Sequence, residues 1–88
     1  MILIDNPKNG YSHMVASSIK ELHDFAAKIG ISKSWFENKR GKYQPHYDVR
    51  QWQVNIAVAY GARLVSSKQI VIFLKENYNP QICLLQSN

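Results

Sequence analysis

The fold is decided by residues 11–30, which read YSHMVASSIKELHDFAAKIG. The first six residues, Tyr11–Ala16, predict a short β-strand, and Ser18 with Glu21 forms an S-x-x-E capping box that predicts the start of a helix. Apolar residues then recur at helical spacing and predict one buried stripe: Ile19, Leu22, Phe25, Ala26 and Ile29. Gly30 is the residue expected just beyond the helix end. A strand followed by an amphipathic helix predicts a sheet with helices packed on it.

The segments on either side of this stretch extend the pattern. Residues 1–4 are apolar and predict a buried strand, and the turn-forming residues 6–10 separate it from the next strand. Residues 31–38 predict a short helical turn that starts at Ser32. Residues 39–45 are polar and basic without apolar periodicity, so we expect a loop there.

The second half of the chain predicts two more helices. One is expected to begin at Asp48 as its cap and to end at Gly61. Its buried face is predicted to hold Val49, Trp52, Ile56, Ala59 and Tyr60. Residues 62–65 predict a strand, residues 66–78 a last helix capped by Ser66, and residues 81–85 a short final strand. The predicted class is therefore α/β or α+β, with a three- to four-stranded sheet and three main helices.

Length and charge narrow the class of protein. The chain has 88 residues, 11 Lys+Arg and 6 Asp+Glu, which gives a net charge of +5 and a pI of about 9.5. We expect residues 1–88 to form one domain, because this length is too short for a second one. The apolar fraction of 45% is too high for a disordered tail. A small binding module, a small enzyme or an oligomer subunit remains.

Cysteine usage and hydropathy predict an intracellular protein. Cys83 is the single cysteine, so the chain cannot form an internal disulfide or a cysteine-rich zinc site. The apolar residues 1–4 are too few for a secretion signal, and no run of 18 apolar residues predicts a membrane span. We therefore expect the protein to be located in the cytoplasm of a bacterial host cell.

Basic and aromatic residues interleave in the middle of the chain. The basic ones are Lys33, Lys39, Arg40, Lys42 and Arg50. The aromatic ones in or beside the same stretch are Trp35, Phe36, Tyr43, Tyr47 and Trp52. Such a mixture is typical of sites for phosphate-bearing ligands that can stack, either a nucleotide or a nucleic acid, although a solvated loop beside core aromatics has the same composition.

Two histidines are candidates for phosphate contacts. His13 lies on a predicted strand, and His46 lies in the dense polar cluster His46-Tyr47-Asp48. The sequence contains no Walker phosphate loop and no H-x-x-x-H pair. A two-metal nuclease would need a carboxylate cluster, which is hard to assemble from the few acidic residues of this chain. We expect no metal and no cofactor. A metal-free mechanism on phosphodiesters would require His13 and His46 to meet in space.

Several short motifs resemble a family of small bacterial and phage domains catalogued as domain of unknown function 4031. They are His13-Met14-Val15-Ala16, Glu21-Leu22-His23, Phe25-Ala26, Ile29-Gly30, Trp35-Phe36, His46-Tyr47-Asp48 and Ala57-Val58-Ala59 to Gly61-Ala62. They span residues 13–65. The chain has Ser17 where the family has Asp, and Gln53-Val54 where the family has a Lys-Arg pair. The resemblance implies a site without an established reaction, and its phage members point to a nucleotide-like ligand.

The leading hypothesis is a non-catalytic domain that binds a small phosphorylated or nucleotide-like ligand. In a phage protein, this ligand would be a host immune signalling nucleotide that the domain sequesters. The expected ligand contacts are His13, Lys33, Trp35, Phe36, Arg40, His46, Tyr47 and Arg50. One alternative is a DNA- or RNA-binding protein, and another is a small His-dependent phosphoesterase. The apolar C-terminal region, residues 66–88, is expected to form a homo-oligomer interface.

Overall fold

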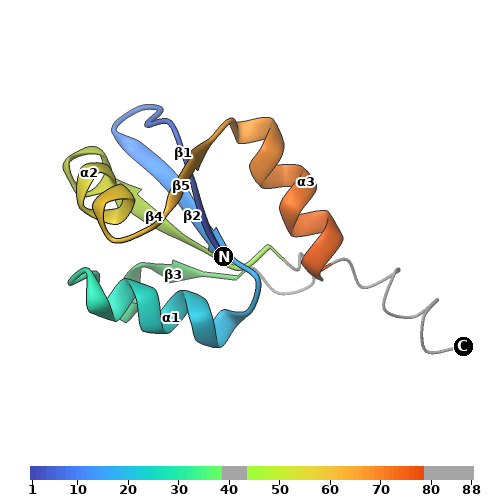
Figure 1. The fold of residues 1–88 in the computed structure, drawn as a ribbon, viewed down its shortest axis with the longest axis horizontal. Coiled ribbons are helices and arrows are strands. Elements are labelled where there is room, and N and C mark those ends of the chain that lie inside the picture. The colour runs from blue at the N-terminus through green and yellow to red at the C-terminus, as the bar shows by residue number, and fades with distance from the viewer. Residues whose placement is uncertain (39–43, 79–88) are drawn as a thin grey trace, which may run out of the picture.

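A computed structural model of the chain describes residues 1–38 and 44–78. The strands are β1 (Ile2–Asp5), β2 (Tyr11–Ala16), β3 (Phe36–Glu37), β4 (His46–Arg50) and β5 (Arg63–Val65). The helices are α1 (Ile19–Lys28), α2 (Gln51–Ala59) and α3 (Ser67–Tyr78), and a 3-10 turn, η1, spans Lys33–Trp35 (Figure 1). No helix within the described residues is both long and apolar enough to cross a bilayer.

The strands form one mixed sheet in the order β3-β4-β2-β1-β5. β1 and β5 run parallel, and the other neighbouring pairs are antiparallel. The predicted α+β class with three packed helices is therefore confirmed, but the predicted number of three to four strands is too low. The two strands absent from the prediction are β3 and β4. β3 has two residues and is too short to show alternation, and Asp48, the predicted helix cap, lies within β4. The predicted strand over residues 81–85 lies outside the described residues.

Alternation along the strands separates two cores on the two faces of the sheet. α1 and α2 cover one face, where the strands contribute Ile2, Ile4, Met14, Ala16, Tyr47 and Val49. On the other face, α3 packs Ile70 and Leu74 against Leu3 of β1 and Val15 of β2. Figure 1 shows α3 on the opposite side of the sheet from α1 and α2. Because α3 packs on β1 and β2, the side chains of β3, β4 and the start of β2 on this face remain at least partly exposed.

The cap predictions hold for two helices and fail for the third. The Ser18 hydroxyl accepts a hydrogen bond from the Glu21 amide at the start of α1, and Ser66 does the same for Gln69 at the start of α3. α2 instead begins after Arg50, whose amide donates to the side chain of Gln53. Asp48 is therefore a strand residue. The buried face of α2 holds Val54 and Ala57, and all four helix positions predicted to be buried are exposed instead: Trp52, Ile56, Ala59 and Tyr60.

Two tyrosines make the fold sensitive to alkaline pH. Burial raises the pKa of Tyr47, and burial together with the nearby Glu21 carboxylate raises the pKa of Tyr78. Because both values are higher in the folded chain, their contribution to stability is fully present below about pH 9 and is lost as the pH rises through the folded pKa values. We expect urea midpoints to fall between about pH 8 and pH 11. The Tyr47→Phe/Tyr78→Phe double variant should show a shallower decline, and an equal decline in both proteins would contradict this assignment.

Candidate functional site

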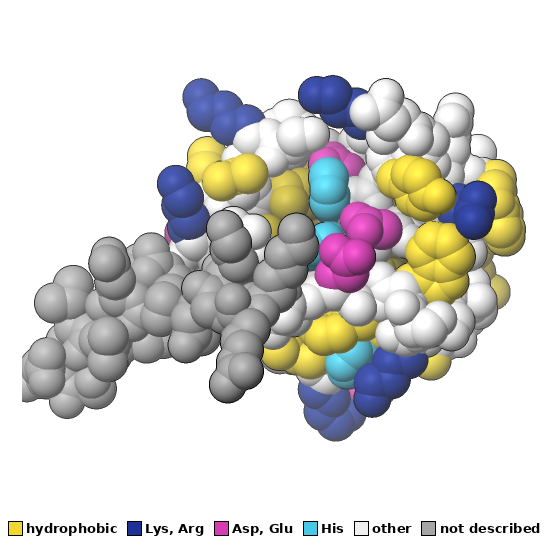
Figure 2. Space-filling view, turned by 180° about the vertical axis from the view of Figure 1, so that it is seen from behind, with side chains coloured by type: hydrophobic (Ala, Val, Ile, Leu, Met, Phe, Trp, Pro, Cys, Tyr) yellow, Lys and Arg dark blue, Asp and Glu magenta, His cyan; other side chains and the backbone are white. Residues whose placement is uncertain are grey.

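Polar side chains gather on the part of the sheet that α3 does not reach. His13 on β2 is the register partner of Asp48 on β4, and Glu37 on β3 is the register partner of His46. The alternation places all four on the same face as Val15. In Figure 2, histidine and acidic side chains meet in the middle of one face of the molecule. We call Glu37, His13, His46 and Asp48 the polar cluster.

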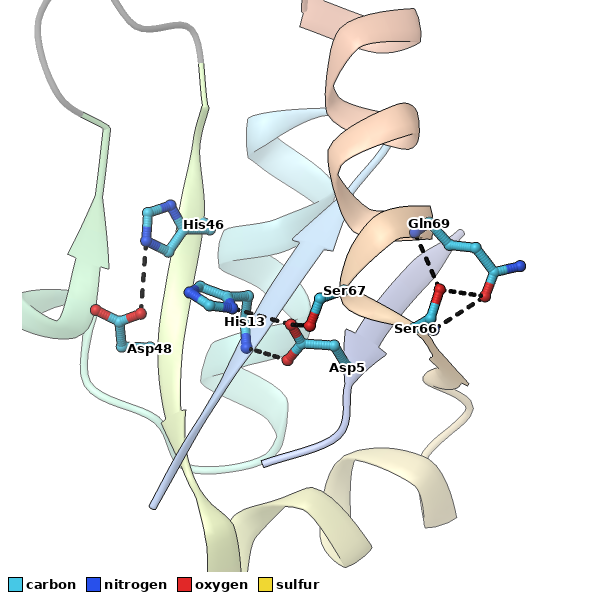
Figure 3. Close-up of polar contacts among 7 residues, drawn as sticks. All are labelled: Asp5, His13, His46, Asp48, Ser66, Ser67 and Gln69. Atoms are coloured by element: carbon cyan, nitrogen blue, oxygen red, sulfur yellow. Dashed lines mark hydrogen bonds and ion pairs between the residues drawn. The ribbon is translucent and has the colours of Figure 1, made fainter. Parts of the chain in front are cut away.

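A buried carboxylate fixes the ring of His13. Asp5, which is 1% exposed, accepts from the backbone amide of His13 at 2.7 Å and from its ring Nδ1 at 2.9 Å. The hydroxyl of Ser67, at the start of α3, donates to the same carboxylate at 3.1 Å. Asp5 accepts at Nδ1, and within residues 1–38 and 44–78 the other ring nitrogen of His13 has no hydrogen-bond partner. Figure 3 shows this edge of the ring pointing toward β4.

The ring of His46 is fixed by a backbone carbonyl. Its Nδ1 donates to the carbonyl oxygen of Gln44 at 2.7 Å, because a carbonyl can only accept. Its Nε2 faces two carboxylates, at 3.5 Å from Oδ1 of Asp48 and 3.8 Å from Oε2 of Glu37. The ring centroids of His46 and His13 are 5.5 Å apart. The structure thus brings the two histidines together, as a shared site requires.

A second feature adjoins the polar cluster where β2 begins and β4 ends. The guanidinium of Arg50 lies 5.0 Å from the ring centroid of Trp35 and 5.7 Å from that of Tyr11. The two rings are 6.5 Å apart and tilted by 35°. Arg50 is the register partner of Tyr11, two residues along from His13 and Asp48. We call Tyr11, Trp35 and Arg50 the stacking group.

Not all of the predicted ligand contacts reach this face. Tyr47 is 1% exposed and points to the opposite side, where its hydroxyl hydrogen-bonds with Nδ1 of His23 at 2.7 Å. Phe36 packs beside it, with its ring centroid 4.6 Å from that of His23. Strand alternation therefore corrects the assignment of both residues, which belong to the core beneath the site. Lys33 is exposed on η1, and Arg40 lies outside the described residues.

Sequence reasoning missed three contributors to the site. Asp5 ends an apolar strand, and a carboxylate at such a position is a signal that was not used. Ser67 was passed over beside the predicted cap Ser66, and Glu37 carries no local signal because it reaches His46 only through strand pairing. Two of the few acidic residues, Glu37 and Asp48, nevertheless come together beside His46. The ligand atoms of Glu37, His46 and Asp48 all lie within 4.8 Å of one another.

A comparison with protein families supports the resemblance noted in the sequence. The family model described as protein of unknown function (DUF4031) matches residues 2–77. The match extends beyond residues 13–65 at both ends and takes in β1 and nearly all of α3. No curated protein and no solved structure matches the chain significantly.

Proposed function

The chain belongs to the DUF4031 family of proteins of unknown function, and from the geometry of its site we propose that it binds a small phosphorylated, nucleotide-like ligand without turning it over. The observation that carries this proposal is the approach of His13 and His46 on a face that α3 leaves accessible. Imidazole N–H groups donate to phosphate oxygens, and such a bond contributes about 1.5–3 kcal/mol when the ring is charged.

Asp5 prepares His13 for this role. The buried carboxylate accepts from the backbone amide and from Nδ1 of His13, which turns the opposite edge of the ring toward a ligand. The His13 side chain is 51% exposed, so its free edge is accessible to a ligand. The orientation of the ring is therefore set before binding, which reduces the entropy lost in the complex.

The stacking group supports an aromatic base beside the phosphate. Indole and guanidinium planes both stack on nucleobases, and one stacked base contributes about 1–3 kcal/mol. Arg50 also brings positive charge to the same face of β4 as Asp48, two residues along the strand. The carboxylates of the polar cluster, Asp48 and Glu37, favour a small ligand over a nucleic acid, because a polyanionic backbone laid across them would be repelled.

Calorimetry with a nucleotide panel tests the proposal. The panel contains nucleoside mono-, di- and triphosphates, cyclic mononucleotides and cyclic dinucleotides, each with and without a divalent metal ion. We expect at least one compound to bind. The substitutions Trp35→Leu and Arg50→Gln should each lower its affinity about tenfold or more. Trp52→Leu and Arg63→Gln are matched controls, because these side chains are exposed elsewhere and should leave affinity unchanged. Silence across the panel, or equal losses in the controls, would overturn the proposal.

The Asp5–His13 pair beside His46 also favours a second candidate, the small His-dependent phosphoesterase. A histidine held by a carboxylate next to another histidine is an arrangement used in general acid–base catalysis. Phosphorus NMR of the bound compound over hours separates the two: a new phosphate signal that disappears in His13→Gln indicates turnover. Sequestration of a host signalling nucleotide by a phage protein, and assembly of a homo-oligomer, stay predictions from the sequence.

A further inference from the structure

The polar cluster concentrates negative charge in a chain of positive net charge. The chain carries six acidic residues and a net charge of +5, yet Glu37 and Asp48 both face the same imidazole nitrogen. Among the described residues, His46 is the only recorded ion-pair partner of these two carboxylates. Two carboxylates this close together repel each other unless a cation lies between them.

The hydrogen bond at the other side of the His46 ring points to the nature of that cation. Metal-binding histidines commonly donate their second N–H to a backbone carbonyl or a carboxylate, which leaves a lone pair for the metal. His46 shows this arrangement, with Nδ1 donating to Gln44 and Nε2 directed at the carboxylates. Without a proton on Nε2, three acceptor atoms face one another.

The distances match those of a metal site. Ligands at 2.0–2.2 Å from a tetrahedral zinc ion lie about 3.3–3.6 Å from one another. Nε2 of His46 is 3.5 Å from Asp48 and 3.8 Å from Glu37, and the donor atoms of all three residues lie within 4.8 Å of one another. Side-chain rotations that draw the two carboxylates toward each other therefore bring the three donors to bonding distance. Their two negative charges also balance a divalent ion.

We propose that Glu37, His46 and Asp48 bind one divalent first-row transition-metal ion of the zinc or manganese type. One imidazole with two carboxylates suits these ions better than calcium, which takes six to eight oxygen ligands. Three protein ligands leave at least one coordination position open.

The metal ion would explain how a phosphate can approach two carboxylates, and this step rests on the proposed function. The phosphate takes the open position on the ion and accepts a hydrogen bond from His13, which lies beside Asp48 in register. Metal binding by the protein alone does not depend on this step. The two claims can therefore fail separately.

The test titrates zinc and manganese into chelator-treated protein without an affinity tag, with calcium as the comparison ion. We expect one zinc or manganese ion per chain by calorimetry. Asp48→Asn should lower the affinity for zinc at least tenfold, because losing a residue that only supports a metal ligand already costs about 10–100-fold. His46→Gln should abolish zinc binding. Glu76→Gln is the matched control, because this carboxylate is exposed on α3. In the unmodified protein, zinc should shift the NMR signal of the His46 Nε2 and leave that of His23 in place.

The possible results distinguish failure of the metal site from failure of the proposed function. Absence of zinc and manganese binding, a zinc signal at His23 instead of His46, or equal affinity in Asp48→Asn and Glu76→Gln would overturn the metal site. Nucleotide binding at full strength in chelator-treated protein would uphold the proposed function and reject the link between phosphate and metal. Metal binding without any nucleotide binding would uphold the site and reject the function.

Discussion

Asp5→Asn is expected to move the proton of the neutral His13 ring from Nδ1 to Nε2, to destabilise the fold by about 1.5–3 kcal/mol and to weaken nucleotide binding about tenfold. The amide has the shape of the carboxylate but presents an NH2 group toward Nδ1 of His13. A donor at that position requires the ring nitrogen to accept. The charge-assisted hydrogen bond from Nδ1 to the carboxylate is replaced by a neutral one at the same time, so the ring is held less firmly in the orientation that a phosphate needs.

Three measurements check this prediction. Nitrogen NMR of the imidazole rings reports the tautomer, urea denaturation reports stability, and calorimetry with the strongest-binding nucleotide of the panel reports affinity. Asp24→Asn is the matched control, because Asp24 is an exposed partner of Lys20 on α1 and such pairs contribute at most about 1 kcal/mol. A His13 ring that keeps its proton on Nδ1 in Asp5→Asn would contradict the role assigned to this carboxylate.

The local signals of the sequence were sufficient for the helices that carry a cap and a stripe. Ser18 and Ser66 mark the starts of α1 and α3, and the buried Leu22 and Ala26 follow the predicted spacing. The predicted helix between Asp48 and Gly61 is present as α2, but the prediction of its buried side is wrong, because the helix is apolar around much of its circumference, with Trp52 66% exposed and Val54 buried. A helix without a clear polar face gives no periodicity from which its buried side can be read.

The candidate site was only partly predictable, because its geometry depends on strand pairing. His13 and His46 could be named as candidates, but only the β2–β4 register brings them together. The aromatic content of the middle segment suggested a continuous binding surface. The pleat instead sends Tyr47 into the core and His46 to the accessible face, although the two are adjacent in sequence. Glu37 and Asp5 join the site from the neighbouring strands β3 and β1, a relation that no local pattern encodes.

Tyr47→Ala is expected to destabilise the fold by about 3–5 kcal/mol, which is a large part of the 5–15 kcal/mol typical of a whole domain. Tyr47 is the largest fully buried side chain in the described part of the chain. It packs against both Phe36 and His23, so removing it leaves a cavity beneath β3 and β4. The positions of Glu37, His46 and Asp48 depend on these two strands, and we expect the site to be lost together with the fold.

Tyr47→Phe separates packing from ligand contact. It removes only the hydrogen bond to His23, so we expect a loss of about 0.5–1.5 kcal/mol in stability and nucleotide affinity within about twofold of the unmodified protein. Tyr60→Ala is the exposed control for the alanine variant, with an expected change below about 1 kcal/mol, since its recorded partner is a cation–π contact with Lys28. Denaturation midpoints and calorimetry measure both effects. Loss of nucleotide binding in a folded Tyr47→Phe protein would mean that the hydroxyl reaches the ligand, which is incompatible with its burial on the opposite face of the sheet.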